Sequence, residues 1–360
     1  MGKVTTQVTT SLLMRVDSTE SIEKCYQNRT LKFSCAANWI NHSIKNRNYT
    51  IGDSEECIFA RLKKNDPRVE AAKNPQTSGI KDSKGQPMRS NLLITRCQTQ
   101  DVCHLRFVST ILMPALCFYN IDMPRLVEKH KQQQFIGIDL DKYCTDMGNK
   151  IEECSFMLIK DPISFYKDLY QSVPIACKKN SEILTTELFY KPEVPLEPIV
   201  VNKVDYHRHK DNEYFYDLPQ EQEEIFWKMP RYEYQSEVRF VIPGIDFKPN
   251  VDAEKDVLSK NKSNNVSQNE EFAFNINNDK YDYESKKLTV ELPHFQEYTE
   301  IFPAADVHTL VFWNIREGGK TFCMEKLNMT QQELSKRQLY TINTESGGIL
   351  CISEEGMKNK

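Results

Sequence analysis

The sequence lacks the features of membrane, secreted and zinc-ribbon proteins. No apolar run approaches the roughly 20 residues that a membrane span needs, and the opening MGKVTTQVTT has no secretory apolar core. No CxxC pair occurs among the 11 irregularly spaced cysteines, and Cys97, Cys103 and His104 fit no usual zinc spacing. Cysteines in apolar settings, such as Cys117, are typical of reduced core residues. We therefore expect a cytoplasmic protein with no membrane partner and no metal site.

The sequence also has no large excess of positive or negative charge. The 47 basic and 51 acidic residues give a net charge of −4, which argues against a protein that coats nucleic acid without specificity. It does not argue against an enzyme that acts on a nucleotide. The content of 39% hydrophobic and 27% charged residues is ordinary for a soluble globular protein, so a packed core is expected.

Internal repeats and a regular βαβ rhythm are absent as well. The 360 residues mix strand-like and helical patterns, which favours an α+β fold with largely antiparallel pairing. We expect a single elaborated catalytic domain over 1–360, with a polar loop at 65–91 and a polar insertion at 251–286, where Asn, Lys, Ser and Glu predominate.

The most informative stretch of the sequence is residues 232–242, Tyr-Glu-Tyr-Gln-Ser-Glu-Val-Arg-Phe-Val-Ile. The stretch alternates with period two, with Gln235, Glu237 and Arg239 in the polar phase, and this pattern predicts a half-buried strand that ends at Pro243-Gly244. The pattern also fits a solvated sheet face with weak cross-strand ion pairs. Before it, Pro219 to Lys228 begins like a helix.

Two further strands are predicted near the start of the chain. Residues 11–16 place Arg15 opposite three apolar side chains, and 30–35 place Ser34 in the polar phase. A capping pattern at Asp17 and Glu20 predicts a short helix between them. A later helix is predicted over 142–154.

Arg15, Ser34 and the triplet Gln235-Ser-Glu237 together resemble the arginine, serine and glutamate pattern of NAD-dependent mono-ADP-ribosyltransferases. The run Tyr-Gln-Ser-Glu-Val-Arg-Phe-Val-Ile-Pro-Gly looks like the segment around the catalytic glutamate of that family. The resemblance implies a mixed, largely antiparallel split β-sheet core of ADP-ribosyltransferase type with helical elaborations. One departure is the second strand, where Ser34-Cys-Ala stands in place of Ser-Thr-Ser.

The resemblance extends to a group of poorly characterised bacterial proteins. They share the segments Thr-Leu-Lys-Phe-Ser and Ile-Gly-Asp-x-Glu-Glu, and they end in a comparable strand, here Lys228, Tyr232 and Gln-Ser-Glu-Val-Arg at 235–239. The similar residues fall within 11–60 and 198–247. A role as a toxin or phage-defence effector, with a possible antitoxin or regulatory partner, is expected from this resemblance.

The family chemistry implies a role for each residue type. Cleavage of the nicotinamide–ribose bond of NAD passes through an oxocarbenium-like state that a fixed carboxylate stabilises, and Glu237 would bind the ribose 2′-hydroxyl there. Arg15 would hold the NAD diphosphate. Ser34 would support the nicotinamide half, so the three side chains are expected to converge on one cleft.

The acceptor side of the reaction is assigned to neighbouring residues. Gln235 would orient a macromolecular acceptor, with protein asparagine or a nucleobase favoured over arginine. Tyr232 and Tyr234 would contact the target, although aromatic residues in a strand also serve as packing.

Two alternatives stay open. The first is a metal-dependent nuclease in which Asp139, Asp141 or Glu237 holds a divalent ion. The second is a non-catalytic nucleotide-sensing module in which Gln235 and Glu237 bind a nucleotide without reaction.

Overall fold

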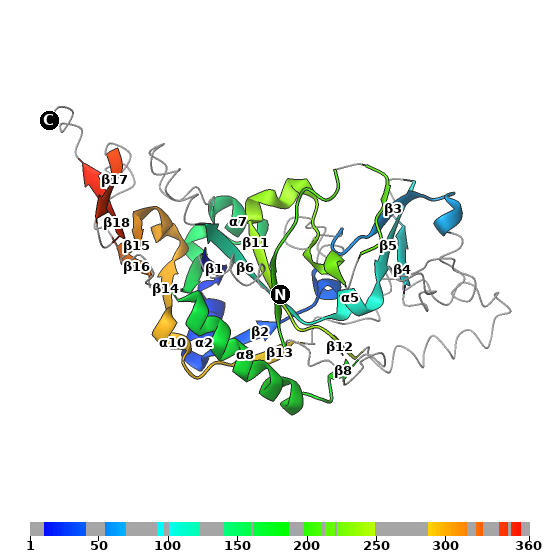
Figure 1. The fold of residues 1–360 in the computed structure, drawn as a ribbon, viewed down its shortest axis with the longest axis horizontal. Helices are drawn as coiled ribbons and strands as arrows, with labels where there is room; N and C mark the ends of the chain where they lie inside the picture. Colours follow the sequence, from blue (N-terminus) through cyan, green and yellow to red (C-terminus); the bar gives the residue numbers. More distant parts are fainter. Residues whose placement is uncertain are drawn as a thin grey trace.

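The largest sheet of the described residues has six strands in the order β14-β7-β1-β6-β11-β9. Four of them, β14, β1, β6 and β11, are labelled in Figure 1. The structure is a computed structural model that describes residues 11–40, 55–69, 92–96, 101–122, 140–159, 161–186, 198–210, 213–219, 222–248, 287–314, 322–326, 338–344 and 347–353. Every strand pair within these ranges is antiparallel. The mixed α and β composition and the largely antiparallel pairing predicted from the sequence are confirmed.

The strands of the six-stranded sheet are β1 (Ser11–Ser18), β6 (Ala115–Asp122), β7 (Cys154–Ile159), β9 (Val200–Lys203), β11 (Glu237–Val241) and β14 (Thr299–Pro303). A four-stranded sheet, β10-β3-β5-β4, consists of β3 (Ala60–Lys63), β4 (Leu92–Arg96), β5 (Val102–Phe107) and β10 (Phe215–Tyr216). The described residues also form four two-stranded sheets: β2 (Thr30–Phe33) with β13 (Leu288–Glu291), β8 (Leu184–Thr186) with β12 (Ile245–Phe247), β15 (Leu310–Asn314) with β16 (Phe322–Lys326), and β17 (Gln338–Thr344) with β18 (Gly347–Ser353).

The α-helices are α2 (Thr19–Asn28), α5 (Val108–Leu112), α7 (Leu140–Asp146), α8 (Pro162–Lys179) and α10 (Phe295–Tyr298). Short 3-10 helices are η1 (Ile151–Glu153), η2 (Glu223–Phe226), η3 (Pro230–Gln235) and η5 (Ala304–Thr309). None of the helices in the described ranges is both long enough and apolar enough to span a membrane.

The six-stranded sheet is packed on both faces, with α7 and α8 on opposite sides (Figure 1). On the α8 side, Phe240 of β11 packs against Phe118 and Phe165, with ring centroids 5.5 and 5.4 Å apart. Because side chains alternate along a strand, Glu237 and Arg239 belong to the other face. All five residues of β11 are buried, so the predicted half-buried strand is instead a central one.

The helix predicted after residues 11–16 is present as α2, but its N-cap is Ser18 and not the predicted Asp17. Helix α2 begins after Ser18, whose side chain accepts a hydrogen bond from the Ser21 amide, and it ends at Arg29 in the left-handed conformation. Helix α8 begins after Asp161, which accepts from the amides of Ile163 and Ser164. The predicted strands at 11–16 and 30–35 are confirmed as β1 and β2.

Several predicted elements differ from the structure. Residues 232–235 are part of the 3-10 helix η3, and Ser236 has a φ of 41°, so the strand begins only at Glu237. The helix predicted over 219–228 is a single 3-10 turn, and the helix predicted over 142–154 is divided between α7 and η1. Helix α8 was not predicted. Residues 70–91 and 251–286 lie outside the described residues.

Candidate functional site

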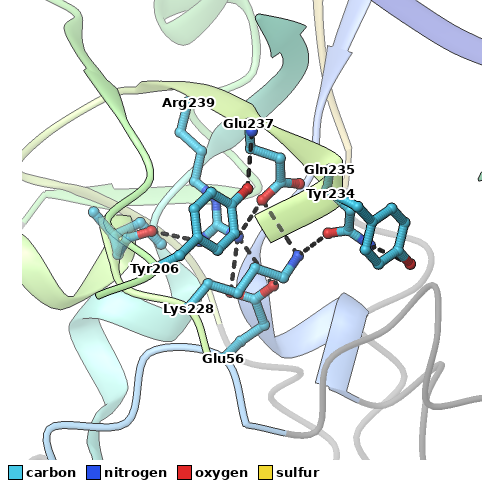
Figure 2. A network of polar contacts seen from close by, with 8 residues as sticks. Glu56, Tyr206, Lys228, Tyr234, Gln235, Glu237 and Arg239 are labelled. Carbon is cyan, nitrogen blue, oxygen red and sulfur yellow. Dashed lines mark hydrogen bonds and ion pairs between the residues drawn. The ribbon is translucent and has the colours of Figure 1, made fainter. Parts of the chain in front are cut away.

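The candidate site is built around Glu237, the first residue of β11. Its carboxylate Oε2 accepts hydrogen bonds from Arg239 Nη2 at 2.9 Å and from Lys228 Nζ at 3.3 Å. Both contacts end on the same oxygen, and no described residue makes a hydrogen bond or ion pair to Oε1 (Figure 2). One carboxylate oxygen is therefore anchored, and the other is not engaged by the described part of the chain.

A second carboxylate balances the two cations. Glu56 lies 3.2 Å from Lys228 Nζ and 2.9 Å from Arg239 Nη2. Glu56, Lys228 and Arg239 are 2%, 6% and 0% exposed, and Glu237 is 9% exposed. Two positive and two negative groups thus form a buried network, which compensates for the cost of removing each charge from water. We call these four residues the charge network.

Further contacts fix the cations in place. Arg239 Nη1 donates to the Ile225 carbonyl oxygen, and the Arg239 guanidinium lies 5.1 Å from the Trp39 ring centroid. Lys228 Nζ donates to Gln235 Oε1 at 2.5 Å. The charge network therefore orients Gln235 as well as Glu237.

The electrostatics keep Glu237 ionised. Burial acts to raise the pKa of its carboxyl group, but Lys228 and Arg239 outweigh burial and lower the pKa to about 2. The same carboxylates keep both cations charged: burial acts to lower the pKa of Lys228 and of Arg239, and Glu237 and Glu56 raise both pKa values well above their ordinary values. Glu237 is consequently an anion throughout the physiological pH range, and it is too weak a base to take up a proton there.

A pocket of about 220 Å³ lies beside this residue. Its lining combines carboxylates, hydroxyls, an amide and a lysine, contributed by Asn120, Lys203, Val204, Asp205, Tyr206, His207, Glu233, Ser236 and Glu237. The Tyr206 hydroxyl accepts a hydrogen bond from the Glu237 backbone amide at 2.9 Å (Figure 2). Glu237 thus belongs both to the buried charge network and to the pocket wall.

Gln235 and Tyr234 connect this region to helix α7. Gln235 Nε2 donates to the Tyr234 hydroxyl at 3.3 Å, and that hydroxyl donates to Asp146 Oδ2. Lys142 Nζ lies 3.6 Å from the Tyr234 ring centroid. Tyr232, in contrast, is only 5% exposed and packs in a core cluster with Tyr206. Of the two tyrosines predicted to contact a target, only Tyr234 is half-buried at the surface.

Arg15 does not lie in the charge network. Strand β6 separates β1 from β11, and the register places Met14, Tyr119 and Glu237 opposite one another. Arg15 is one residue out of phase with this row, so it belongs to the opposite face of the sheet from Glu237. Its ion-pair partner is Asp17, 3.8 Å away. The structure does not bring Arg15 and Glu237 together.

Ser34 is also distant from Glu237 along the sheet. It pairs through its backbone with Ala115, which lies opposite Val241 at the far end of β11. Four residues of strand correspond to roughly 13 Å at ~3.3 Å per residue. Its hydroxyl accepts a hydrogen bond from Asn38 Nδ2 at 2.9 Å. The expected convergence of Arg15, Ser34 and Glu237 on one cleft is therefore not found.

Three members of the charge network had no predicted role. Glu56, Lys228 and Arg239 all fall within the two segments for which a resemblance to bacterial proteins was expected, namely Ile-Gly-Asp-x-Glu-Glu and the Lys, Tyr, Gln-x-Glu-x-Arg run. That expected resemblance was the signal in the sequence that could have drawn attention to them. Spacing alone could not show that residues 56 and 239 meet.

The described residues contain no group of three or more His, Cys, Asp or Glu side chains arranged to hold a metal ion. Of the residues considered for a nuclease, Asp139 lies outside the described ranges and Asp141 lies in the first turn of α7. Comparison with family models, with curated proteins and with solved structures finds no match to this chain.

Proposed function

We propose that the protein is an NAD-dependent ADP-ribosyltransferase-like enzyme in which Glu237 stabilises the transition state. The observation that supports this function is the environment of Glu237 among the described residues: a carboxylate held ionised and anchored by them through one oxygen, at the wall of a polar pocket. A fixed anion with these properties suits a reaction in which positive charge develops on a sugar.

In the proposed reaction, the bond between ribose C1′ and the nicotinamide nitrogen breaks, and both electrons leave with nicotinamide. The macromolecular acceptor supplies the electron pair that forms the new bond to C1′, and it loses its proton to solvent. Glu237 does not accept that proton, because Lys228 and Arg239 hold its pKa at about 2 against the opposing effect of burial. Its role is electrostatic, and the cations fix its position.

Gln235 is proposed to orient the acceptor, as the resemblance implies. Its carbonyl oxygen is held by Lys228 and its amide nitrogen lies within hydrogen-bond distance of the Tyr234 hydroxyl. The diphosphate role implied for Arg15 and the nicotinamide role implied for Ser34 are not supported by their positions relative to Glu237.

A second candidate is a nucleotide-binding module that does not react. The observation that favours it is the balance of the charge network, where two cations within 3.3 Å of one carboxylate oxygen reduce the negative potential available to a developing cation. Such a module would bind NAD or another nucleotide without releasing nicotinamide.

The test uses the full chain, labelled NAD and a cell lysate. We expect wild-type protein to release nicotinamide and transfer label. We expect Glu237→Gln to reduce transfer by about 10²–10³, the usual cost of removing one transition-state contact. Glu291→Gln serves as a control because this carboxylate is exposed on β13. Full activity of Glu237→Gln would contradict the proposal.

Because Glu237 also pairs with buried cations, its substitution requires a second variant. Glu237→Asp keeps the charge and shortens the side chain by one methylene, so we expect a folded protein with a strongly reduced rate. Thermal unfolding of each variant separates a loss of activity from a loss of structure. Nucleotide binding without turnover by wild-type protein would favour the second candidate.

A further inference from the structure

One proton of the proposed reaction has no base assigned to it. The acceptor loses a proton as its bond to C1′ forms, and Glu237 does not take it up, because against the effect of burial Lys228 and Arg239 lower the pKa of its carboxyl group to about 2. Burial and the nearby Glu237 carboxylate raise the pKa of Tyr206, so its hydroxyl keeps its own proton. A base for this step must therefore be a different residue of the pocket.

An imidazole lines the pocket beside Glu237. The described residues with titratable side chains that line it together with Glu237 are Lys203, Asp205, Tyr206, His207 and Glu233. At neutral pH a lysine is ordinarily protonated and a carboxylate is ordinarily a weak base, whereas an imidazole takes up and releases protons between about pH 5 and 8. Among these residue types, histidine is the one suited to accept a proton and release it again.

A carboxylate lies beside the ring of this histidine. Glu233 Oε1 is 3.4 Å from His207 Nε2. A proton on Nε2 that faces this carboxylate leaves the lone pair on Nδ1, and the carboxylate stabilises the imidazolium that forms when Nδ1 takes up a second proton. The His207 and Glu233 side chains are 75% and 59% exposed. A proton that His207 accepts can therefore pass on to solvent.

The backbone before His207 runs beside the start of β11. The Val204 amide donates to the Glu237 carbonyl oxygen at 2.9 Å, and the Tyr206 hydroxyl accepts from the Glu237 amide at 2.9 Å (Figure 2). The His207 amide donates to Asp205 Oδ1 at 2.8 Å, which fixes the local turn. The segment that contains His207 is thus attached to the residue proposed to stabilise the transition state.

We propose that His207 is the general base of the reaction and that Glu233 is the residue that positions it. This inference rests on the proposed function. As the lone pair of the acceptor forms the bond to C1′, the proton of the acceptor group moves to Nδ1 of His207, and the electrons of the broken bond to that proton stay on the acceptor atom. Nicotinamide leaves with the electrons of the glycosidic bond. His207 then releases the proton to solvent.

The first test measures label transfer from NAD to a cell lysate by the full chain as a function of pH. We expect the wild-type rate to rise between about pH 5 and 8, because only the neutral imidazole can accept a proton. His207→Gln should lower the rate at pH 8 by about 10²-fold, a usual effect of removing a general base, and should abolish the rise. Glu233→Gln should have a smaller effect, because the imidazole remains.

Added imidazole separates a base from a residue with a structural role. His207→Ala removes an exposed ring, so free imidazole in the buffer should restore part of the transfer. Glu237→Gln should not respond to imidazole. Isothermal titration with NAD should give the wild-type affinity for His207→Ala, because the proposed base acts on the acceptor and not on NAD.

The matched control is His294→Gln. His294 Nδ1 lies 2.9 Å from Glu297 Oε1, and both side chains are exposed, so this pair has similar chemistry but does not line the pocket. We expect its rate and pH dependence to equal those of wild-type protein. Thermal unfolding of each variant confirms that the compared proteins are folded.

The outcomes separate this inference from the proposed function. A wild-type protein that transfers label, together with an unchanged rate and pH dependence in His207→Gln or no response of His207→Ala to imidazole, would retain the transferase and overturn the role of His207. A wild-type protein that neither releases nicotinamide nor transfers label would overturn both.

Discussion

Two glutamate side chains show how strongly surroundings control the charge of one residue type. Glu224 is completely buried, and its Oε1 accepts a hydrogen bond from Thr110 Oγ1 while Oε2 has no partner among the described residues. Burial raises its pKa to about 7. Glu237 is also buried, but Lys228 and Arg239 lower its pKa to about 2. The presence of cations, and not the depth of burial, separates the two.

Glu224→Gln is expected to stabilise the protein at alkaline pH. The pKa of Glu224 rises from 4.5 in the unfolded chain to about 7 in the folded one, so the folded state binds this proton more tightly. The protonated Glu224 side chain stabilises the folded state fully below about pH 4.5, and this stabilisation is lost as the pH rises through 7. The difference in free energy of unfolding between Glu224→Gln and wild type should therefore be about 3 kcal/mol more favourable to the variant at pH 8 than at pH 4, at about 1.36 kcal/mol per pKa unit.

Urea unfolding at the two pH values measures this difference. The control is Glu223→Gln, the same change at the adjacent exposed residue, which should leave the pH dependence of stability unchanged. Equal pH dependence of wild type and Glu224→Gln would show that Glu224 does not carry a raised pKa.

At the scale of the element, helix α8 depends on its first residues. Asp161 Oδ1 accepts from the amides of Ile163 and Ser164 at 3.1 Å each, and Oδ2 accepts from the Ser164 hydroxyl at 2.7 Å. Pro162 occupies the first helical position, where its missing amide proton costs nothing. The helix then buries Phe165, Leu169 and other residues against the six-stranded sheet.

Asp161→Ala is expected to lower the free energy of unfolding by about 1 kcal/mol, because it removes the acceptor for the first amides of α8. Asp161→Ser retains a capping oxygen and should recover most of that loss. Denaturant titration of both variants measures the effect. Equal loss in the two variants would indicate that the cap does not stabilise the helix.

The elements also show what the sequence could predict. Strands β1 and β2, with alternating apolar residues, were predicted with the correct first residue, and their last residues differ by two from the prediction. Residues 232–236 were misassigned because so short a stretch does not separate period two from the period three of a 3-10 helix, which buries Tyr232 and Gln235 on the same side. This segment contains a hydrogen bond from Lys228 to Gln235, and Ser236 has a positive φ. Neither feature can be recognised from the hydrophobic periodicity of the segment.

The same limit applies to the candidate site. Glu237 and Gln235 both contact Lys228, and their closeness could be expected because they are two residues apart in the sequence. Glu56 could not be placed with them, because the distance between residues 56 and 237 depends on how two sheets pack. Arg15 was expected near Glu237 because the family resemblance implied it. The alternation of residues 11–16 could not test this, because the strand order and register decide which face of the sheet Arg15 occupies.

In the whole molecule, the charge network joins two sheets. Glu237 and Arg239 belong to the six-stranded sheet, whereas Glu56 lies just before β3 of the four-stranded sheet. Arg106 of β5 donates to the Glu56 carbonyl oxygen at 2.7 Å. The ion pairs of Glu56 therefore contribute both to the site and to the attachment of one sheet to the other.

Arg239→Met is expected to lower the free energy of unfolding by about 3–5 kcal/mol, because it leaves Glu56 and Glu237 buried with a single cation. Hydrogen exchange should accelerate in β3 and β5 as well as in β11. Arg208→Met is the control, since Arg208 forms a partly exposed ion pair with Asp217 and its loss should cost at most about 1 kcal/mol. Faster exchange confined to β11 would argue against a shared attachment.

The long sequence separation within the charge network has a consequence for protein synthesis. Glu56 is synthesised early, and its ion pairs with Lys228 and Arg239, which compensate for its burial, can form only after β11 has been made. A nascent chain that stops short of β11 leaves Glu56 without these two cations, and the pocket lacks Glu237. A chain truncated before β11 therefore cannot form the candidate site.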